Sequence, residues 1–156
     1  FQRENSGDKL TIPAGAVIQT EGSDEKYKDY INIMWLERKG WSTPEELIEQ
    51  EKKFINSING KYIIIGLADG DNETNKEIDR LMEKSFGDNY INPRKLLVEY
   101  GKKNIDKNTT EYDKEKISKG IIPSYLADNN GLLNVTGYKV LSNNICEKIN
   151  SLGYLK

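Results

Sequence analysis

The chain has 156 residues, of which 36% are apolar and 31% charged, and its formal net charge is -2. A chain of this length and composition forms one globular domain with a sizeable core, which excludes a disordered protein. Acidic and basic residues are mixed along it, so we expect no nucleic-acid partner. No apolar run approaches the roughly 20 residues that cross a bilayer, so we expect no membrane span. Histidine is absent, which removes His-based proton transfer and His-ligated metal sites.

The single cysteine, Cys146, cannot form a disulfide within the chain, so it does not indicate a redox compartment. It falls on the expected core side of the last helix, and we expect a small buried side chain there. The chain begins at Phe1, without a methionine and without a signal peptide. We therefore expect an excised or processed piece of a longer protein, and its localisation stays undetermined.

Residues 1–30 are predicted to form a short β-hairpin followed by a polar connection. The extended runs Leu10-Thr11-Ile12 and Val17-Ile18 are separated by a turn signal with Pro13 and Gly15. Residues 31–156 are predicted to form a single α/β domain.

The first core strand of this domain is predicted over residues 32–36. A strong helix start follows it, because Thr43 can cap, Pro44 suits the first helical position and Glu46 can complete a capping box. The second core strand is predicted over residues 61–67. Its nearly unbroken apolar character is typical of a parallel strand that is covered on both faces.

Four further helices and one short strand are predicted after residue 67. A helix with one apolar face ends at Gly87, a strand covers residues 89–91, and a helix that starts at Asn92-Pro93 is expected to stop at Gly101. A short charged helix covers residues 110–119. The final helix is expected to bury the stripe Tyr138, Leu141, Ile145, Ile149 and Leu152. Alternation of strands and helices predicts a parallel sheet with helices on both sides, which is a three-layer α/β fold.

Two blocks of the chain resemble one enzyme family. Residues 133–138 read Leu-Asn-Val-Thr-Gly-Tyr, and residues 35–41 read Trp-Leu-Glu-Arg-Lys-Gly-Trp. The first block resembles the closing block of SGNH (GDSL-type) hydrolases, Asp-x-x-His-Leu-Asn-x-x-Gly-Tyr, which carries two members of a Ser-His-Asp triad. The second resembles the Trp-Leu-Gly-Arg-Asn block of that family, which supplies oxyanion-hole donors. The resemblance implies a flavodoxin-like sheet that is N-terminally incomplete, since the family's Gly-Asp-Ser block does not occur in the chain.

The hallmark positions of that family are altered in this chain. Leu132 stands where the resemblance places the catalytic histidine. The loop is one residue longer than the family pattern, so the aspartate is either retained as Asp128 or replaced by Asn129. Glu37 takes the glycine position and Lys39 the asparagine position, and a carboxylate there opposes the negative charge of a tetrahedral intermediate. The resemblance therefore implies a pseudoenzyme with no catalytic residues and no cofactor.

This pattern predicts a catalytically inactive SGNH hydrolase-like domain that serves as a binding or assembly module. The implied setting is a cell-surface carbohydrate or polymer, or a bacterial or phage-tail surface protein. The alternative is one part of an active SGNH esterase or carbohydrate deacetylase, whose serine block lies upstream or on another chain. A triad needs a general base, and the missing histidine favours the inactive form.

Ligand-binding candidates gather in loops after the core strands, the edge where open parallel sheets bind ligands. Glu37 and Lys39 form either a new polar site that binds a ligand without cleaving it, or surface charges where a catalytic site has been lost. The Asp69-Asp71 spacing is that of a calcium loop, but Thr74 stands where such a loop needs glycine, so we predict a helix cap and no metal. Trp35 and Tyr138 are expected in the core, whereas Trp41 and Tyr125 are candidates for an aromatic sugar platform. The candidate residues are Glu37, Lys39, Trp41, Asp69, Asp71, Tyr125, Asp128 and Asn130.

The strand over residues 31–36 would have an unpaired edge if the earlier strands of such a sheet are missing. Proteins normally cover such edges. We expect the N-terminal hairpin, a homo-oligomer partner or a missing segment to pack there.

Overall fold

The structure is a computed structural model that describes residues 29–36, 40–58, 60–68, 73–106, 109–128 and 132–155, without the side chains of Glu73 and Thr74. The expected N-terminal hairpin lies outside these ranges. The elements in chain order are strand β1 (Asn32–Trp35), helix α1 (Pro44–Ile55), strand β2 (Tyr62–Ile65), helix α2 (Glu73–Phe86), the 3-10 turn η3 (Gly87–Asn89), strand β3 (Tyr90–Ile91) and helices α3 (Pro93–Lys103), α4 (Glu111–Ser118) and α5 (Val135–Ser151).

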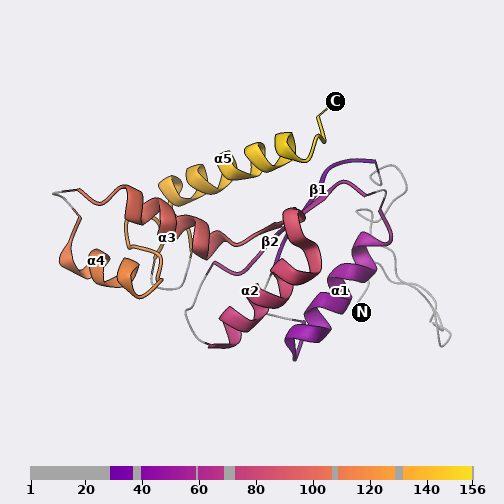
Figure 1. Cartoon of the computed structure of the whole chain (residues 1–156), viewed down its shortest axis with the longest axis horizontal. Coiled ribbons are helices and arrows are strands. Elements are labelled where there is room, and N and C mark those ends of the chain that lie inside the picture. The colour runs from indigo at the N-terminus through magenta and orange to yellow at the C-terminus, as the bar shows by residue number, and fades with distance from the viewer. Residues whose placement is uncertain are drawn as a thin grey trace, which may run out of the picture.

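The three described strands form one parallel sheet in the order β1-β2-β3. Trp35 is paired with Ile65, and Ile65 in turn with Ile91. Helices α1 and α2 lie on one side of this sheet and α5 on the other (Figure 1). The predicted α/β class and parallel sheet are therefore confirmed, and the arrangement is compatible with a three-layer fold.

The central strand β2 is covered on both faces, as its apolar run predicts. Ile63, Ile64 and Ile65 are at most 1% exposed. Alternate side chains of a strand point to opposite faces, so these three residues divide between two cores. Ile63 and Ile65 join a core with residues of α3, α5 and the loop before α5. Ile64 joins a second core with residues of α1 and α2.

The start of α1 follows the predicted capping pattern with one difference. The Thr43 hydroxyl accepts a hydrogen bond from the Glu46 amide at 3.2 Å, and Pro44 occupies the first turn. The Glu46 carboxylate accepts from the amide of Ser42 at 2.7 Å, one residue before the cap. This pair of hydrogen bonds differs from a capping box in that Glu46 accepts from the amide before the cap and not from that of Thr43 itself.

The expectation that Gly101 ends its helix differs from the structure. Helix α3 continues past Gly101 to Lys103, so Gly101 does not end it. Instead, Gly101 is buried, and a Cβ atom there would lie 3.2 Å from Pro123 and 3.3 Å from Ile117. The absence of a side chain therefore lets the segment from α4 to Pro123 pack closely on α3.

The expectation that Cys146 is buried is wrong, because its side chain is exposed. In the predicted apolar stripe of α5, only Leu141 is fully buried, while Ile145, Ile149 and Leu152 are partly buried. The small sheet covers one narrow side of α5, so residue 146 faces away from it.

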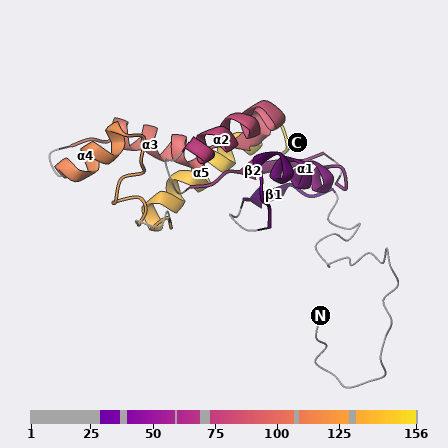
Figure 2. The ribbon, with the colours of Figure 1, turned by 90° about the horizontal axis from the view of Figure 1, so that it is seen from below.

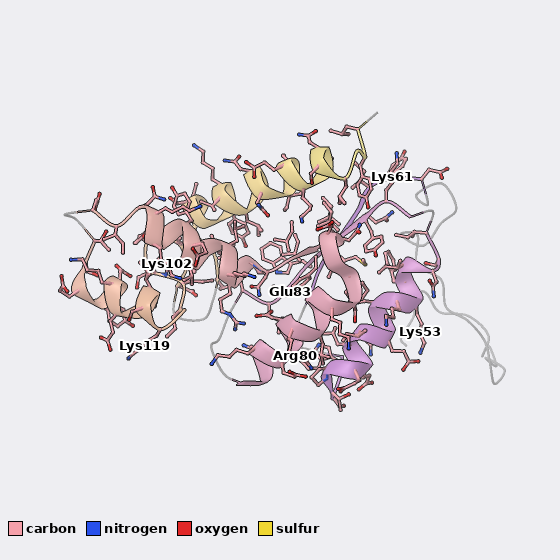
Figure 3. All side chains as sticks on the ribbon, in the orientation of Figure 1. Lys53, Lys61, Arg80, Glu83, Lys102 and Lys119 are labelled. Atoms are coloured by element: carbon pink, nitrogen blue, oxygen red, sulfur yellow. The ribbon has the colours of Figure 1, made fainter. Side chains whose placement is uncertain are left out.

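The outer surfaces of the helices carry ion pairs formed within single helices. Figure 3 labels Lys53, Arg80, Lys102 and Lys119, which pair with acids three or four residues away at 2.6 to 3.0 Å. Such exposed pairs contribute little to stability. Helix α4 lies at the opposite end of the molecule from α1 in both ribbon views (Figures 1 and 2). Among the described helices, none combines the length and apolar character needed to cross a membrane.

Candidate functional site

The loop before α5 holds the positions that the family resemblance assigns to the triad. The Asp128 carboxylate accepts a hydrogen bond from the Leu132 amide at 2.9 Å, and the Asp128 amide donates to the Leu132 carbonyl at 2.9 Å. Ala127 and Leu133 form an antiparallel bridge next to this pair. The Leu132 side chain is 66% exposed. Asp128 therefore closes its own loop, and an exposed leucine occupies the position that the resemblance assigns to the general base.

The residues that carry the resemblance after Leu132 have clear packing roles. The Asn134 side-chain oxygen accepts from the amides of Thr136 and Gly137, at 2.9 and 3.1 Å, and so caps α5. Its side-chain nitrogen donates to the Tyr125 carbonyl at 2.8 Å. A Cβ atom on Gly137 would lie 2.2 Å from the Leu126 carbonyl oxygen. This block therefore seats the first turn of α5 directly on the preceding loop.

Trp35 and Tyr138 lie at the surface, which corrects the expectation that they belong to the core. Their ring centroids are 6.0 Å apart with an interplanar angle of 68°, and the residues are 41% and 49% exposed. Ile33, on the same face of β1, is 48% exposed, and Val135, one turn before Tyr138 on α5, is 86% exposed. We call Ile33, Trp35, Val135 and Tyr138 the open face.

The open face exists because the sheet extends beyond the helix that covers it. Ile33 and Trp35 pair with Ile63 and Ile65, so all four side chains point to the α5 side of the sheet. The β2 side chains are buried in the core, whereas those of β1 touch solvent. Contiguous exposed apolar side chains mark interaction sites more often than single ones do.

Trp41 and Tyr125, the two candidates for a sugar platform, do not come together. Trp41 packs against the core between the sheet and α1 and α2, while Tyr125 packs against the core on the α5 side. The Tyr125 hydroxyl donates to the Gly101 carbonyl at 3.5 Å. Both rings are partly buried. They lie on opposite sides of the sheet and make no common surface.

The remaining predicted site residues, Glu37, Lys39, Asp69, Asp71, Asn129 and Asn130, lie outside the described residues. Their proposed roles stay predictions. Within the part of the chain that is described, no three His, Cys, Asp or Glu side chains gather where they could hold a metal ion.

One exposed serine contacts an ionisable side chain. The Lys116 ammonium donates to the Ser124 hydroxyl at 3.2 Å. Asp113, beside them, accepts from the Ser124 amide at 2.6 Å and from the Thr110 hydroxyl at 2.8 Å. The Lys116 nitrogen also lies 5.4 Å from the centre of the Tyr112 ring. Lys116 therefore contacts this serine as a hydrogen-bond donor, held between the Ser124 hydroxyl and the Tyr112 ring.

The same cluster explains the acidity of Asp113. Burial raises the pKa of its carboxyl, but hydrogen bonds from Ser124 and Thr110 and the charge of Lys116 outweigh burial and hold the pKa below its ordinary value. The carboxylate ties α4 to the Pro123–Tyr125 turn. The arrangement is that of a structural link, with the serine amide already committed to Asp113.

A buried polar cluster that the sequence did not suggest joins α2, β3 and α3. The Tyr90 hydroxyl donates to one Asp79 oxygen at 2.9 Å, and the Arg94 guanidinium donates to the other. Asp79 and Arg94 are 7% and 8% exposed. Burial, together with the charge of Asp79, raises the pKa of Tyr90 well above its ordinary range. The signal in the sequence is the spacing of Asp79 from Met82 and Phe86, which places a charge on the buried face of α2.

Comparison with known proteins adds no relative. No protein-family model, no curated protein and no solved structure matches the chain. The family resemblance therefore rests on the residues of this chain alone, and it stays a hypothesis.

A groove of about 590 Å³ lies between α3 and α5. Its apolar side chains are those of Leu96, Tyr100 and Val140, and its polar rim carries Glu99, Lys103, Thr136, Lys139, Asn143, Asn144 and Glu147. The two lysines balance the two glutamates. A surface of this kind suits a neutral ligand with many hydroxyl or amide groups.

Proposed function

We propose that the chain is a catalytically inactive SGNH hydrolase-like domain that serves as a binding or assembly module. The observation that carries the proposal is the closing loop. There Asp128 bonds the Leu132 amide, and Leu132 replaces the group that would accept a proton. A serine triad cannot operate without such a group.

The fold is compatible with this proposal. The strand order β1-β2-β3, with two helices on one side and the last helix on the other, is what the closing half of a flavodoxin-like sheet would have. The flavodoxin-like arrangement is itself part of the proposal. Asn134 and Gly137 keep structural roles that do not depend on catalysis, which explains how this half of the block can persist when the catalytic half does not.

An acetyl-ester hydrolysis assay tests the absence of catalysis. We expect the chain to release product at the rate of a protein of equal lysine content, because Leu132 stands where the resemblance places the general base. Ser124→Ala and Lys116→Ala are the informative variants, since these residues form the described serine–amine contact. Saturable turnover that is lost in Ser124→Ala would overturn the proposal.

The alternative is an active esterase or carbohydrate deacetylase completed by an upstream serine block or by another chain. The presence of Asp128 in the closing loop favours it. The discriminating measurement is acetyl-ester turnover by the full-length parent protein. Turnover that disappears when an upstream serine is replaced would establish the alternative.

We propose the groove between α3 and α5 as the binding site for a carbohydrate ligand. Amides, hydroxyls and balanced charges along its rim offer hydrogen bonds to sugar hydroxyls, and Tyr100 offers a ring. Titration with soluble oligosaccharides, followed by chemical shifts of the Asn143 and Asn144 side-chain amides, tests this ligand class. Shifts confined to other surfaces would exclude the groove.

A further inference from the structure

Strand β1 has a free edge within the described sheet. The Asn32 amide donates to the Lys61 carbonyl and the Leu36 amide to the Ile65 carbonyl, both at 2.9 Å. Alternate residues of a parallel strand face the same neighbour, so the backbone groups of Ile33 and Trp35 point away from β2. No described strand lies on that side. An edge of this kind is a template for another strand.

The two residues with outward backbone groups also carry exposed side chains. Ile33 and Trp35 are 48% and 41% exposed and lie on the same face of the strand. They flank Met34 symmetrically. A two-fold axis through Met34 would therefore place Ile33 of one copy opposite Trp35 of another, and Trp35 opposite Ile33.

We infer that a second copy of this chain binds along β1 in antiparallel orientation and joins the two sheets into one. This inference rests on the proposed assembly function and names its partner. Ile33 and the second copy's Trp35 exchange two backbone hydrogen bonds, and the symmetric pair exchanges two more. On the α5 side, each isoleucine packs across the junction against an indole, which is a favourable cross-strand pair.

The exposed area of the open face is sufficient to contribute substantially to a dimer. Taking about 200 Å² for each aromatic side chain and about 150 Å² for each aliphatic one, the four residues leave roughly 400 Å² of apolar surface in solvent. A standard interface buries about 800 Å² per partner. The backbone of β1 and the side chains around the open face supply the remaining area. The net charge of -2 per chain opposes association only weakly.

Self-complementarity distinguishes a second copy from other occupants of the edge. A foreign strand needs matching side chains of its own, whereas β1 already presents an isoleucine and a tryptophan at the spacing that a two-fold axis requires. Docking of residues 1–28 of the same chain is the competing outcome, and the experiment separates the two.

Sedimentation of the full chain from about 1 to about 100 μM is the first test. We expect a monomer–dimer equilibrium whose dissociation constant rises about tenfold or more in Ile33→Lys, because edge lysines block strand pairing. Ile105→Lys is the matched control, since Ile105 is 46% exposed and lies beyond α3. A monomer at the highest concentration overturns the inference. So does a dimer that Ile33→Lys leaves intact, and so does dimerisation only after residues 1–28 are removed.

Cysteine cross-linking tests the register even where Ile33→Lys does not fold. In the proposed dimer, Met34 faces its own symmetry mate across a non-hydrogen-bonded pair, with Cα atoms about 4.5 Å apart, which is within disulfide range. Met34→Cys in a Cys146→Ser background should therefore give a covalent dimer on mild oxidation. Ile105→Cys in the same background should not. A Met34→Cys protein that stays unlinked overturns the inference. Both readouts are independent of ester turnover, so failure here is distinguishable from failure of the proposed function.

Discussion

The rings of Trp35 and Tyr138 meet nearly edge to face, with centroids 6.0 Å apart, where the last helix touches the first described strand. Neither ring is buried. The contact marks the limit of the surface that α5 covers, because the next residue of β1 on this face, Ile33, has no described helix over it. The pair therefore lies outside the buried core and begins the open face.

Removal of the Tyr138 ring should cost stability modestly and change the surroundings of Trp35. We expect Tyr138→Ala to lower the free energy of unfolding by about 1 kcal/mol, the usual contribution of an aromatic pair. In a Trp41→Phe background, Trp35 is the only tryptophan, and its emission should shift to the red. Tyr112→Ala, which removes an exposed ring from α4, should leave that emission unchanged.

Breaking the buried Asp79–Arg94 pair should be the most costly single change to a charged residue described above. Asp79→Ala leaves the Arg94 guanidinium without its buried carboxylate and should destabilise the protein by about 3 to 5 kcal/mol in chemical denaturation. The double variant Asp79→Leu, Arg94→Met should recover most of the loss. Glu77→Ala, which breaks an exposed pair with Arg80, should have no measurable effect. A small loss in Asp79→Ala would show that water reaches the cluster.

Acid should weaken the attachment of α4 through Asp113. Its carboxyl has a lowered pKa in the folded chain, so the stability it contributes is fully present above its unfolded pKa of about 3.9 and is lost as pH falls through the folded pKa. Asp113→Asn should reduce stability at pH 7 by about 1 to 2 kcal/mol through loss of charge-assisted hydrogen bonds. It should also flatten the dependence of the unfolding free energy on pH below about 4. Asp88→Asn, at an exposed turn, serves as the control.

Two buried glycines should respond differently to a methyl group. A Cβ on Gly137 meets the Leu126 carbonyl at 2.2 Å, whereas one on Gly101 meets side-chain atoms at 3.2 to 3.3 Å. Backbone cannot yield as side chains can, so we expect Gly137→Ala to cost about 3 kcal/mol and Gly101→Ala about 1 kcal/mol or less. Thermal unfolding of the two variants gives the comparison. Equal losses would contradict the close seating of α5.

Helix starts were predictable from local chemistry alone. Thr43, Asn92 and Thr110 all cap the helices that follow them, with Pro44 and Pro93 in the first turn. These signals work because a cap depends on hydrogen bonds within a few residues. The apolar run of β2 was equally informative, because a central strand is covered whatever its neighbours are.

The exposure of residues at the border of the core was not predictable in the same way. Trp35 and Tyr138 have the composition of core residues, but their burial depends on how far α5 reaches across the sheet. The spacing of apolar residues on a helix shows which side faces inward and not where the opposing layer ends. Cys146 was misplaced for the same reason, and Trp41 and Tyr125 lie on opposite sides because the chain crosses the sheet between them.

Gly66 directly follows β2, and the Tyr90 hydroxyl lies against its backbone. A Cβ atom on residue 66 would lie only 2.1 Å from that hydroxyl. The tyrosine fills the volume that any larger residue would need. Since that hydroxyl also holds Asp79, the smallest enlargement at residue 66 would displace the ring and disturb a charge pair formed by two other helices. The buried link between α2 and α3 therefore depends on the absence of a methyl group at a residue that carries no charge itself.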